Sequence, residues 1–200
     1  MNQEKVWDEI AQFWNERKTR RNKLIDEFLI GKKTVLDLGC GSGRNFIKTR
    51  AKIYGVDFSS QMLKYAKEKA EKLKLNFELI HAPSHNLPFK DNFFDSVICI
   101  ALLHCIKSSR KRKNTLKEIH RVLKSNELCL IIVWNKTSRR LKNKSKYHKI
   151  SWTIDSGKVY RDNYLYDNVE LENELKDVGF KIIEKFENRN NIIIIVKKSE

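Results

Sequence analysis

A short apolar run that ends in three closely spaced glycines constrains this fold more than any other feature. The run V-L-D-L occupies residues 35–38, and G-C-G-S-G follows at 39–43. An apolar run of this length before a glycine cluster is typical of a buried strand that turns sharply at its end. Glycines let the backbone approach a ligand closely, and a helix after such a loop offers free N–H groups. We therefore expect a ligand site at the carboxyl end of this strand, followed by a helix.

Strand and helix patterns alternate along the rest of the chain. Apolar runs predict strands at 33–38, 52–56, 77–80, 95–101 and 128–134. Helical spacing predicts helices at 7–14, at 24–29, after a cap at Ser59 or Ser60, after Ser108 or Ser109, and at 169–178 before Gly179. Two last strands, 180–186 and 192–198, are separated by turn residues and predict a hairpin. The pattern indicates a doubly wound α/β sheet, mostly parallel, with an antiparallel last strand.

The length of 200 residues favours one domain covering 1–200. The alternation breaks at about 135–159, where the chain is basic and poor in apolar residues. We interpret this stretch as an insertion.

Positive charge is concentrated in three clusters. Lys and Arg number 41 against 25 Asp and Glu, which gives a net charge of +16. The clusters occupy 17–23, 107–113 and 136–149, and the third contains no acidic residue. A clustered excess of this kind favours RNA or DNA as a partner, with an anionic membrane surface as the second choice. A Lys-rich composition that follows from an AT-rich genome is the alternative.

Other features exclude several classes of protein. No run approaches the ~18 apolar residues of a membrane-spanning helix, and the N-terminus does not resemble a signal peptide. The four cysteines show no C-x-x-C spacing, so we expect reduced thiols with neither a disulfide nor a metal site. We expect the protein in the cytosol or nucleus, away from membranes.

Asp57 closes the second predicted strand, where its carboxylate can accept hydrogen bonds from a ribose diol. The motif D-x-G-C-G-x-G at 37–43, with Asp57, resembles the class I S-adenosylmethionine-dependent methyltransferases over nearly the whole chain. The resemblance implies a seven-stranded sheet and S-adenosylmethionine as cofactor. The glycine loop would hold its amino acid part, Asp57 its ribose, and Phe58 and Met62 would border its adenosine. The cofactor-binding residues so implied are Asp37, Gly39, Cys40, Gly41, Gly43, Asp57, Phe58, Met62 and Ala101.

The segment L-P-F-x-D-x-x-F-D at 87–95 also looks like this class. The family often places an acidic residue four positions before the Leu-Pro pair, where it meets the adenine amino group. This chain has Pro83 there, so Ser84 or a backbone group would take that role.

Three segments resemble a narrower group, the tRNA wobble-uridine carboxymethyl methyltransferases. They are V-W-D-E-I-A at 6–11, C-I-A-L-L-H-C at 99–105 and, within 161–171, R-D-N-Y-L-Y followed by E-L. The chain departs from this group at Cys105, where the group has a second histidine, and at Asp162 and Asn163, where it has tyrosines. It also has Asn22-Lys23 where the group has Trp-Pro. The resemblance implies methyl esterification of 5-carboxymethyluridine, or a derivative, at the wobble position.

This chemistry suits the residues available. The attacking carboxylate is already ionised near neutral pH, so alignment matters more than a general base. Arg161 offers a fork that binds two carboxylate oxygens, and we expect Tyr164 and His104 to line the same pocket as catalytic residues. The alternatives are a surface ion pair for Arg161 and a structural role for His104. Tyr166, Trp7 and Trp14 we interpret as packing residues, and the N-terminal aromatic face as a cap over the cofactor cleft.

The expected partner is the anticodon arm of a tRNA, whose phosphates would meet the 136–149 cluster. Trp134, Tyr147 and Trp152 beside this cluster could stack on unpaired bases. The family resemblance also implies a small zinc-ribbon activator protein that covers an apolar sheet edge. Two alternatives stay open: a small-molecule methyltransferase acting on a quinone or sterol precursor, and a catalytically silent RNA-binding subunit of the same fold.

Overall fold

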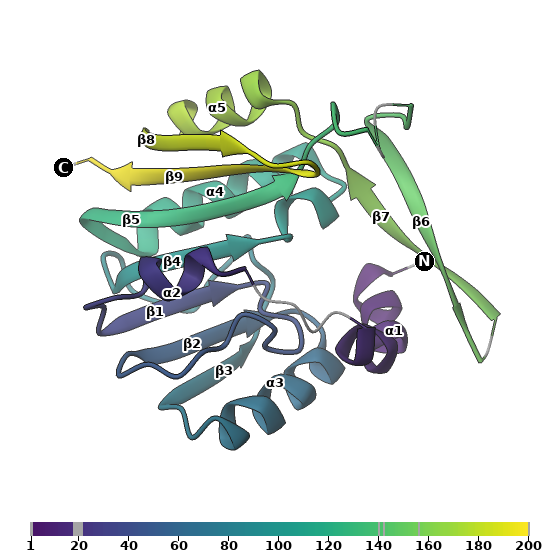
Figure 1. The fold of residues 1–200 in the computed structure, drawn as a ribbon, viewed down its shortest axis with the longest axis horizontal. Helices are drawn as coiled ribbons and strands as arrows, with labels where there is room; N and C mark the ends of the chain where they lie inside the picture. Colours follow the sequence, from purple (N-terminus) through teal and green to yellow (C-terminus); the bar gives the residue numbers. More distant parts are fainter. Residues whose placement is uncertain (1, 18–21, 140, 142, 156, 200) are drawn as a thin grey trace.

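A seven-stranded sheet forms the centre of the computed structural model, which describes residues 2–17, 22–139, 141, 143–155 and 157–199 (Figure 1). The strand order is β3-β2-β1-β4-β5-β9-β8. β9 runs antiparallel to both of its neighbours, and the other pairings are parallel. The expected mostly parallel sheet with an antiparallel last strand is therefore confirmed. The strands are β1 (Thr34–Leu38), β2 (Lys52–Asp57), β3 (Phe77–His81), β4 (Phe94–Ile100), β5 (Leu123–Trp134), β8 (Phe180–Glu187) and β9 (Asn191–Lys198).

Helices pack on both faces of this sheet because successive strand residues point to opposite sides. Leu36 and Leu38 of β1 belong to an apolar cluster with α4 (Ser109–Val122) and α5 (Asn168–Asp177). Val35, next to Leu36, belongs to a second cluster with α2 (Leu24–Phe28) and α3 (Ser60–Lys72). No helix among the described residues is long and apolar enough to cross a membrane.

Side-chain caps begin three of the helices. The side chain of Ser59 accepts a hydrogen bond from the Met62 N–H, and that of Ser108 from the Lys111 N–H. Asp167 caps α5 in the same way. The predicted helix starts are therefore confirmed, at the earlier serine of each pair.

The prediction of a helix after the glycine cluster is wrong. Residues 41–45 form consecutive turns, in which the Gly43 N–H donates to the Cys40 carbonyl and the Phe46 N–H to the Gly43 carbonyl, both at 3.0 Å. Only residues 44–51 separate the cluster from β2. That length is too short for a helix that also returns the chain to the start of a parallel strand.

The basic stretch after β5 leads into a second, two-stranded sheet. β6 (Tyr147–Ile154) and β7 (Gly157–Tyr164) form an antiparallel hairpin that continues past 159. The hairpin and α1 (Gln3–Arg17) lie together beyond the carboxyl ends of the parallel strands (Figure 1). They share a third apolar cluster, which includes Trp7, Met62, Val159 and Trp152. These two elements therefore cover the edge of the sheet where ligands bind in folds of this kind.

Candidate active site

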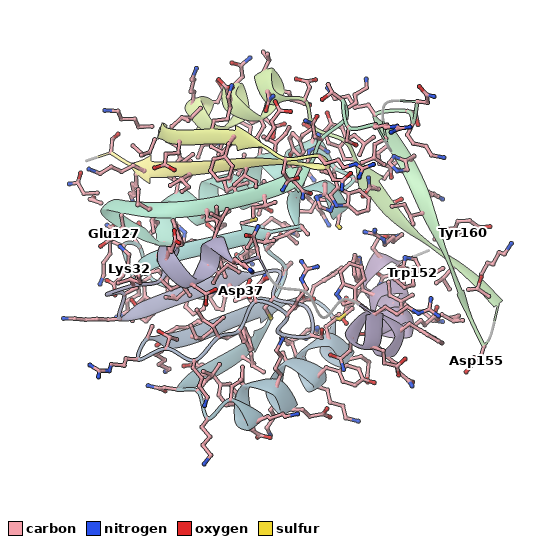
Figure 2. All side chains as sticks on the ribbon, in the orientation of Figure 1. Lys32, Asp37, Glu127, Trp152, Asp155 and Tyr160 are labelled. Carbon is pink, nitrogen blue, oxygen red and sulfur yellow. The ribbon has the colours of Figure 1, made fainter. Side chains whose placement is uncertain are left out.

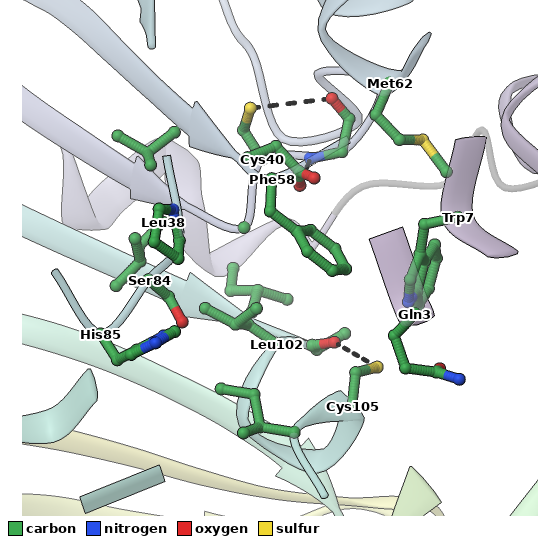
Figure 3. A pocket seen from close by; sticks show the side chains of 18 of the residues that line it. Gln3, Trp7, Leu38, Cys40, Phe58, Met62, Ser84, His85, Leu102 and Cys105 are labelled. Carbon is green, nitrogen blue, oxygen red and sulfur yellow. Dashed lines mark hydrogen bonds between the residues drawn. The ribbon is translucent and has the colours of Figure 1, made fainter. Parts of the chain in front are cut away.

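A cleft of about 300 Å³ lies at the carboxyl ends of β1, β2 and β4, with α1 forming one wall (Figure 3). Its volume falls in the range of sites for small molecules. The cleft brings together most of the residues expected to bind a cofactor: Gly39, Cys40, Gly41, Asp57, Phe58, Met62 and Ala101. Pro83 and Ser84 also line it.

The glycine loop is shaped by backbone angles that other residues rarely adopt. Gly39, Gly41 and Gly43 have φ of 72°, 55° and 70°. A Cβ on Gly39 would lie 2.8 Å from Leu102 Cδ1, and a Cβ on Gly43 would lie 2.7 Å from Phe46 Cδ2. At Gly41 the nearest atom to such a Cβ is 3.8 Å away. Gly41 therefore exposes backbone to the cleft, whereas Gly43 does not line the cleft and packs on Phe46.

Asp57 joins this loop to the start of α3. One carboxylate oxygen accepts a hydrogen bond from the Gly41 N–H at 2.9 Å, and the other accepts from the Ser59 N–H at 3.0 Å. Burial raises the pKa of Asp57 to about 6, although these hydrogen bonds oppose the shift. The carboxylate therefore fixes the loop and faces the cleft at the same time.

Asp37 lies beneath the cleft and does not line it. Neither of its buried carboxylate oxygens has a hydrogen-bond partner among the described residues. Burial raises the pKa of Asp37 to about 7, while the nearby Arg44 charge opposes the shift. Burial of a carboxylate is costly, and the Arg44 charge and the Asn45 side chain offset only part of that cost, so this arrangement favours a ligand that carries positive charge.

These residues fit S-adenosylmethionine, which carries a sulfonium and an ammonium group. The buried carboxylates of Asp37 and Asp57 complement positive charge, and the glycine loop offers close backbone approach. Phe58 and Met62 provide an apolar wall for an adenosine (Figure 3). When bound there, the cofactor supplies an electrophilic methyl group.

Arg161 lies in a cage of tryptophans behind the cleft. Only 3% of the residue is exposed, so Arg161 is a buried residue and not a surface one. Its guanidinium carbon lies 5.4, 5.6 and 5.2 Å from the rings of Trp7, Trp14 and Trp134. Its Nη1 donates to Cys105 Sγ at 3.5 Å, and Cys105 lines the cleft. The positive charge is thus held one side chain away from the cleft.

His104 is buried beside this cage and does not line the cleft. Its Nδ1 accepts a hydrogen bond from the Trp134 N–H at 3.2 Å, and its ring stacks on Trp134 at 4.8 Å. Burial, with the Arg161 charge as a second cause, holds the pKa of His104 well below its usual range. The ring is therefore neutral near pH 7, with its proton on Nε2.

Tyr164 also lies outside the cleft. Its hydroxyl donates to Glu170, and the Arg112 guanidinium lies 3.7 Å from its ring centroid. Tyr166 is fully buried and donates to Glu174, in agreement with a packing role. The expected pocket-lining positions of His104 and Tyr164 differ from the structure because both side chains are taken up by neighbouring elements.

The N-terminal aromatic face, expected as a cap over the cofactor cleft, lies on α1, but sequence reasoning missed Gln3. Trp7 and Trp14, interpreted as packing residues, also line the cleft and meet edge to face at 5.0 Å. Gln3 lines it as well, and its Oε1 accepts a hydrogen bond from the Asp162 N–H at 2.9 Å. The 6–11 segment that resembles the tRNA enzymes was the available signal. It gave no indication that α1 and β7 would meet.

The basic clusters divide into different environments. Arg112 is buried, Lys113 lies 3.6 Å from Asp177, and Lys107 and Lys111 line the cleft. Lys146 pairs with Asp167 and Glu170. Exposed cations of the third cluster include Arg139, Lys144 and Lys149. The expectations placed on Lys18, Arg20, Arg21, Arg140 and Lys142 lie outside the described residues.

The aromatic residues expected beside the third cluster are not presented for stacking on bases. Trp134 stacks on His104, and Trp152 packs against Trp14 with ring centroids 5.8 Å apart. Tyr147 is half-buried. Tyr160 is 45% exposed and lies on the opposite face of the hairpin from Trp152 (Figure 2).

A ligand cleft at the glycine end of a seven-stranded sheet with an antiparallel last strand defines the class I S-adenosylmethionine-dependent methyltransferases. A family model described as "Methyltransferase domain" matches residues 36–131. The crystal structure of a SAM-dependent methyltransferase from Aquifex aeolicus superposes with a TM-score of 0.65 at 25% identity, covering 96% of this chain and 95% of the other.

Two relatives in sequence extend this comparison. Uncharacterized protein MJ1252 of Methanocaldococcus jannaschii is 30% identical over 90% of this chain and 76% of its own length. The tRNA (carboxymethyluridine(34)-5-O)-methyltransferase of Arabidopsis thaliana is 29% identical over 65% of this chain, which spans only 32% of that enzyme. The chain is an S-adenosylmethionine-dependent methyltransferase and belongs to the same family as MJ1252.

Proposed function

We propose that this methyltransferase esterifies the carboxylate of 5-carboxymethyluridine, or a derivative, at the wobble position of a tRNA anticodon. The observation that carries the proposal is the buried Arg161, whose charge is held beside Cys105 at the cleft. Such a permanent cation suits an anionic acceptor better than a quinone or sterol precursor. The match to the Arabidopsis tRNA enzyme supports the same substrate class.

In this proposal the residues around the cleft provide charge for the acceptor and hold it in position. From behind Cys105, the Arg161 charge would attract the acceptor carboxylate to the cleft and offset its charge without removing the lone pair that attacks. The tryptophans around it exclude water and strengthen that interaction. No side chain has to remove a proton, which agrees with the neutral, buried His104. His104 would instead hold Trp134, one wall of the Arg161 cage.

The RNA surface that we propose follows the third basic cluster and the outer face of the hairpin. Arg139, Lys144 and Lys149 are exposed there and suit phosphates. Tyr160 alternates with buried neighbours on β7, and its exposed ring suits stacking on an unpaired base. The stacking role expected for Trp134, Tyr147 and Trp152 therefore passes to Tyr160.

We also propose a small zinc-ribbon activator protein as partner, on the family resemblance, with action in the cytosol or nucleus. The sheet has two edge strands, β3 and β8. β8 exposes Ile183 and Phe186, by 44% and 37%, and is the more apolar candidate edge.

The decisive experiment is transfer of a labelled methyl group into total tRNA, with and without an activator of this kind, followed by nucleoside analysis. An ester releases its label as methanol under mild alkali, whereas a methyl group on a ring nitrogen does not. Alkali-labile label at the wobble uridine is the expected result, and stable label would exclude the carboxylate acceptor. Label in a quinone fraction would favour the small-molecule alternative, and a protein that binds no cofactor would be a silent subunit.

A further inference from the structure

The loop after β4 lines part of the cleft. Residues 101–108 contribute Ala101, Leu102, Cys105, Ile106, Lys107 and Ser108 to the lining. The loop starts at Ala101, whose φ of 64° is rare for a residue with a side chain. It continues through a short 3₁₀ helix, Leu103–Cys105. A loop with this backbone needs neighbours that hold it in place.

Arg112 supplies such a support from α4. It is 3% exposed, and its Nη1 donates to the Lys107 carbonyl at 2.9 Å and to the Ile106 carbonyl at 3.2 Å. Both carbonyls belong to residues that line the cleft. The Arg112 side chain therefore fixes the far end of the loop from behind.

Tyr164 holds Arg112 in turn. The guanidinium carbon lies 3.7 Å from the Tyr164 ring centroid and 5.8 Å from that of Tyr166. The Tyr164 hydroxyl is bound to Glu170, which pairs with Lys146 at 2.9 Å. Within the described part of the chain no carboxylate forms an ion pair with Arg112, so ring and carbonyl contacts hold its charge.

β7, the strand that carries Tyr164, also contacts the 101–108 loop at a second point. Arg161, three residues before Tyr164 on β7, donates to Cys105 Sγ in the middle of the loop. The strand thus reaches the loop directly through Arg161 and indirectly through Tyr164 and Arg112.

We propose that Arg112 is a positioning residue that fixes the 101–108 loop for the methyl acceptor, and that Tyr164 acts through Arg112 rather than by touching the substrate. The proposal requires the methyltransferase activity but rests on the proposed tRNA acceptor only for its kinetic assay.

Arg112→Lys tests the first part, because it keeps the charge but loses the flat face and the fork. We expect kcat/KM for the acceptor to fall by about 10- to 100-fold, the loss that goes with one buried charged hydrogen bond. The dissociation constant of the cofactor should stay within about twofold, because Arg112 bonds to residues 106 and 107, at the end of the loop away from Ala101, and does not contact the glycine loop or Asp57. Amide hydrogen exchange should rise across 102–108 and not in β1. Arg110→Lys, the same change at an exposed site on α4, is the matched control.

Tyr164 separates positioning from catalysis. Tyr164→Phe keeps the ring under Arg112, and Tyr164→Leu removes it. We expect the Leu variant to have at least about 10-fold lower kcat/KM than the Phe variant, with exchange across 102–108 raised only in the Leu variant. Equal loss in both variants would make the hydroxyl the active group and overturn the proposal.

Two further outcomes are decisive. Loss of cofactor binding in Arg112→Lys, together with a general rise in hydrogen exchange, would show a merely structural residue and overturn the proposal. If the wild-type protein labels no tRNA, the proposed acceptor fails, but the exchange and cofactor measurements still test the role of Arg112.

Discussion

For the two carboxylates at the glycine loop, burial favours the protonated form, whereas a cationic cofactor favours the ionised form. Asp37 and Asp57 are buried, which raises the pKa of each carboxyl, yet a cationic cofactor needs both ionised. Sequence reasoning located both residues because their positions after strands follow from the motif. It could not show that Asp37 lies beneath the cleft without a hydrogen-bond partner among the described residues, since burial depends on how α1 and the loops pack.

Asp37→Asn should separate stability from binding. A raised pKa means that the folded state takes up a proton between the unfolded value of 3.8 and about 7. The contribution of Asp37 to stability is therefore fully present below pH 3.8 and is lost as pH rises through 7. We expect the variant without cofactor to melt at a higher temperature than wild type at about pH 8, and to bind the cofactor more weakly. Thermal melting and calorimetry at about pH 5 and about pH 8 measure both effects. A lower melting temperature on the alkaline side would contradict the assigned burial cost.

Arg161→Lys addresses the acceptor side. A lysine keeps a charge but cannot form a fork or lie flat among the tryptophans. We expect kcat to fall by about 100-fold for the carboxylate acceptor, with the cofactor dissociation constant within about twofold of wild type. Single-turnover methyl transfer and calorimetry provide the two readouts. Turnover at the wild-type rate would remove Arg161 from the site.

At the scale of the elements, periodicity and capping serines were enough to place most of the sheet and its helices. No helix follows Gly43 because only residues 44–51 separate it from β2. The expectation of a helix came from the glycine motif and did not take this length into account. The hairpin of β6 and β7 was not predicted because its first residues lie within a basic stretch interpreted as an insertion, although Ile150, Trp152 and Ile154 alternate with polar residues. The position of α1 over the cleft was expected, but its contact with β7 could not be predicted, since it depends on residues far apart in sequence, such as Gln3 and Asp162.

Asp8 should stabilise the packing of α1 against α3 at the cleft. Its carboxylate accepts from the Ser59 hydroxyl at 2.6 Å and from the Gln61 N–H at 3.1 Å, which joins α1 to the start of α3. We expect Asp8→Ala to lower the free energy of unfolding by about 1 kcal/mol, the usual cost of a lost cap, and to weaken cofactor binding. Urea unfolding and calorimetry test this. Glu9→Ala is the control, because Glu9 lies on the same helix and pairs with Lys5 at 4.0 Å, within α1 itself. Equal effects in both variants would argue against a specific role for Asp8.

At the scale of the whole molecule, the cations behind the net charge of +16 lie in different environments. Part of it is internal, as at Arg112 and Arg161, and part is paired, as at Lys146. The sequence predicted where the charges cluster. It could not predict which of them remain available to a polyanion, because that depends on acids brought close by the fold.

Neutralising Arg139, Lys144 and Lys149 to Gln should weaken tRNA binding in a salt-dependent way. The slope of log affinity against log salt should decrease in magnitude by about 0.7 to 0.9 for each phosphate that the protein no longer neutralises. The matched control replaces Lys64, Lys72 and Lys74, three exposed lysines of α3 and the turn that follows it, and changes the net charge equally. Filter binding at several salt concentrations measures the slope. Identical slopes in the two triple variants would assign the charge to composition alone.

The tryptophan cage has a practical consequence for following the protein in solution. The chain contains four tryptophans. Three surround Arg161, and the fourth, Trp152, lies against Trp14. All tryptophan fluorescence therefore originates within one small volume beside the cleft, and two of the rings, Trp7 and Trp14, line it. Ultraviolet emission should report occupancy of the cleft directly, so a titration needs no attached dye.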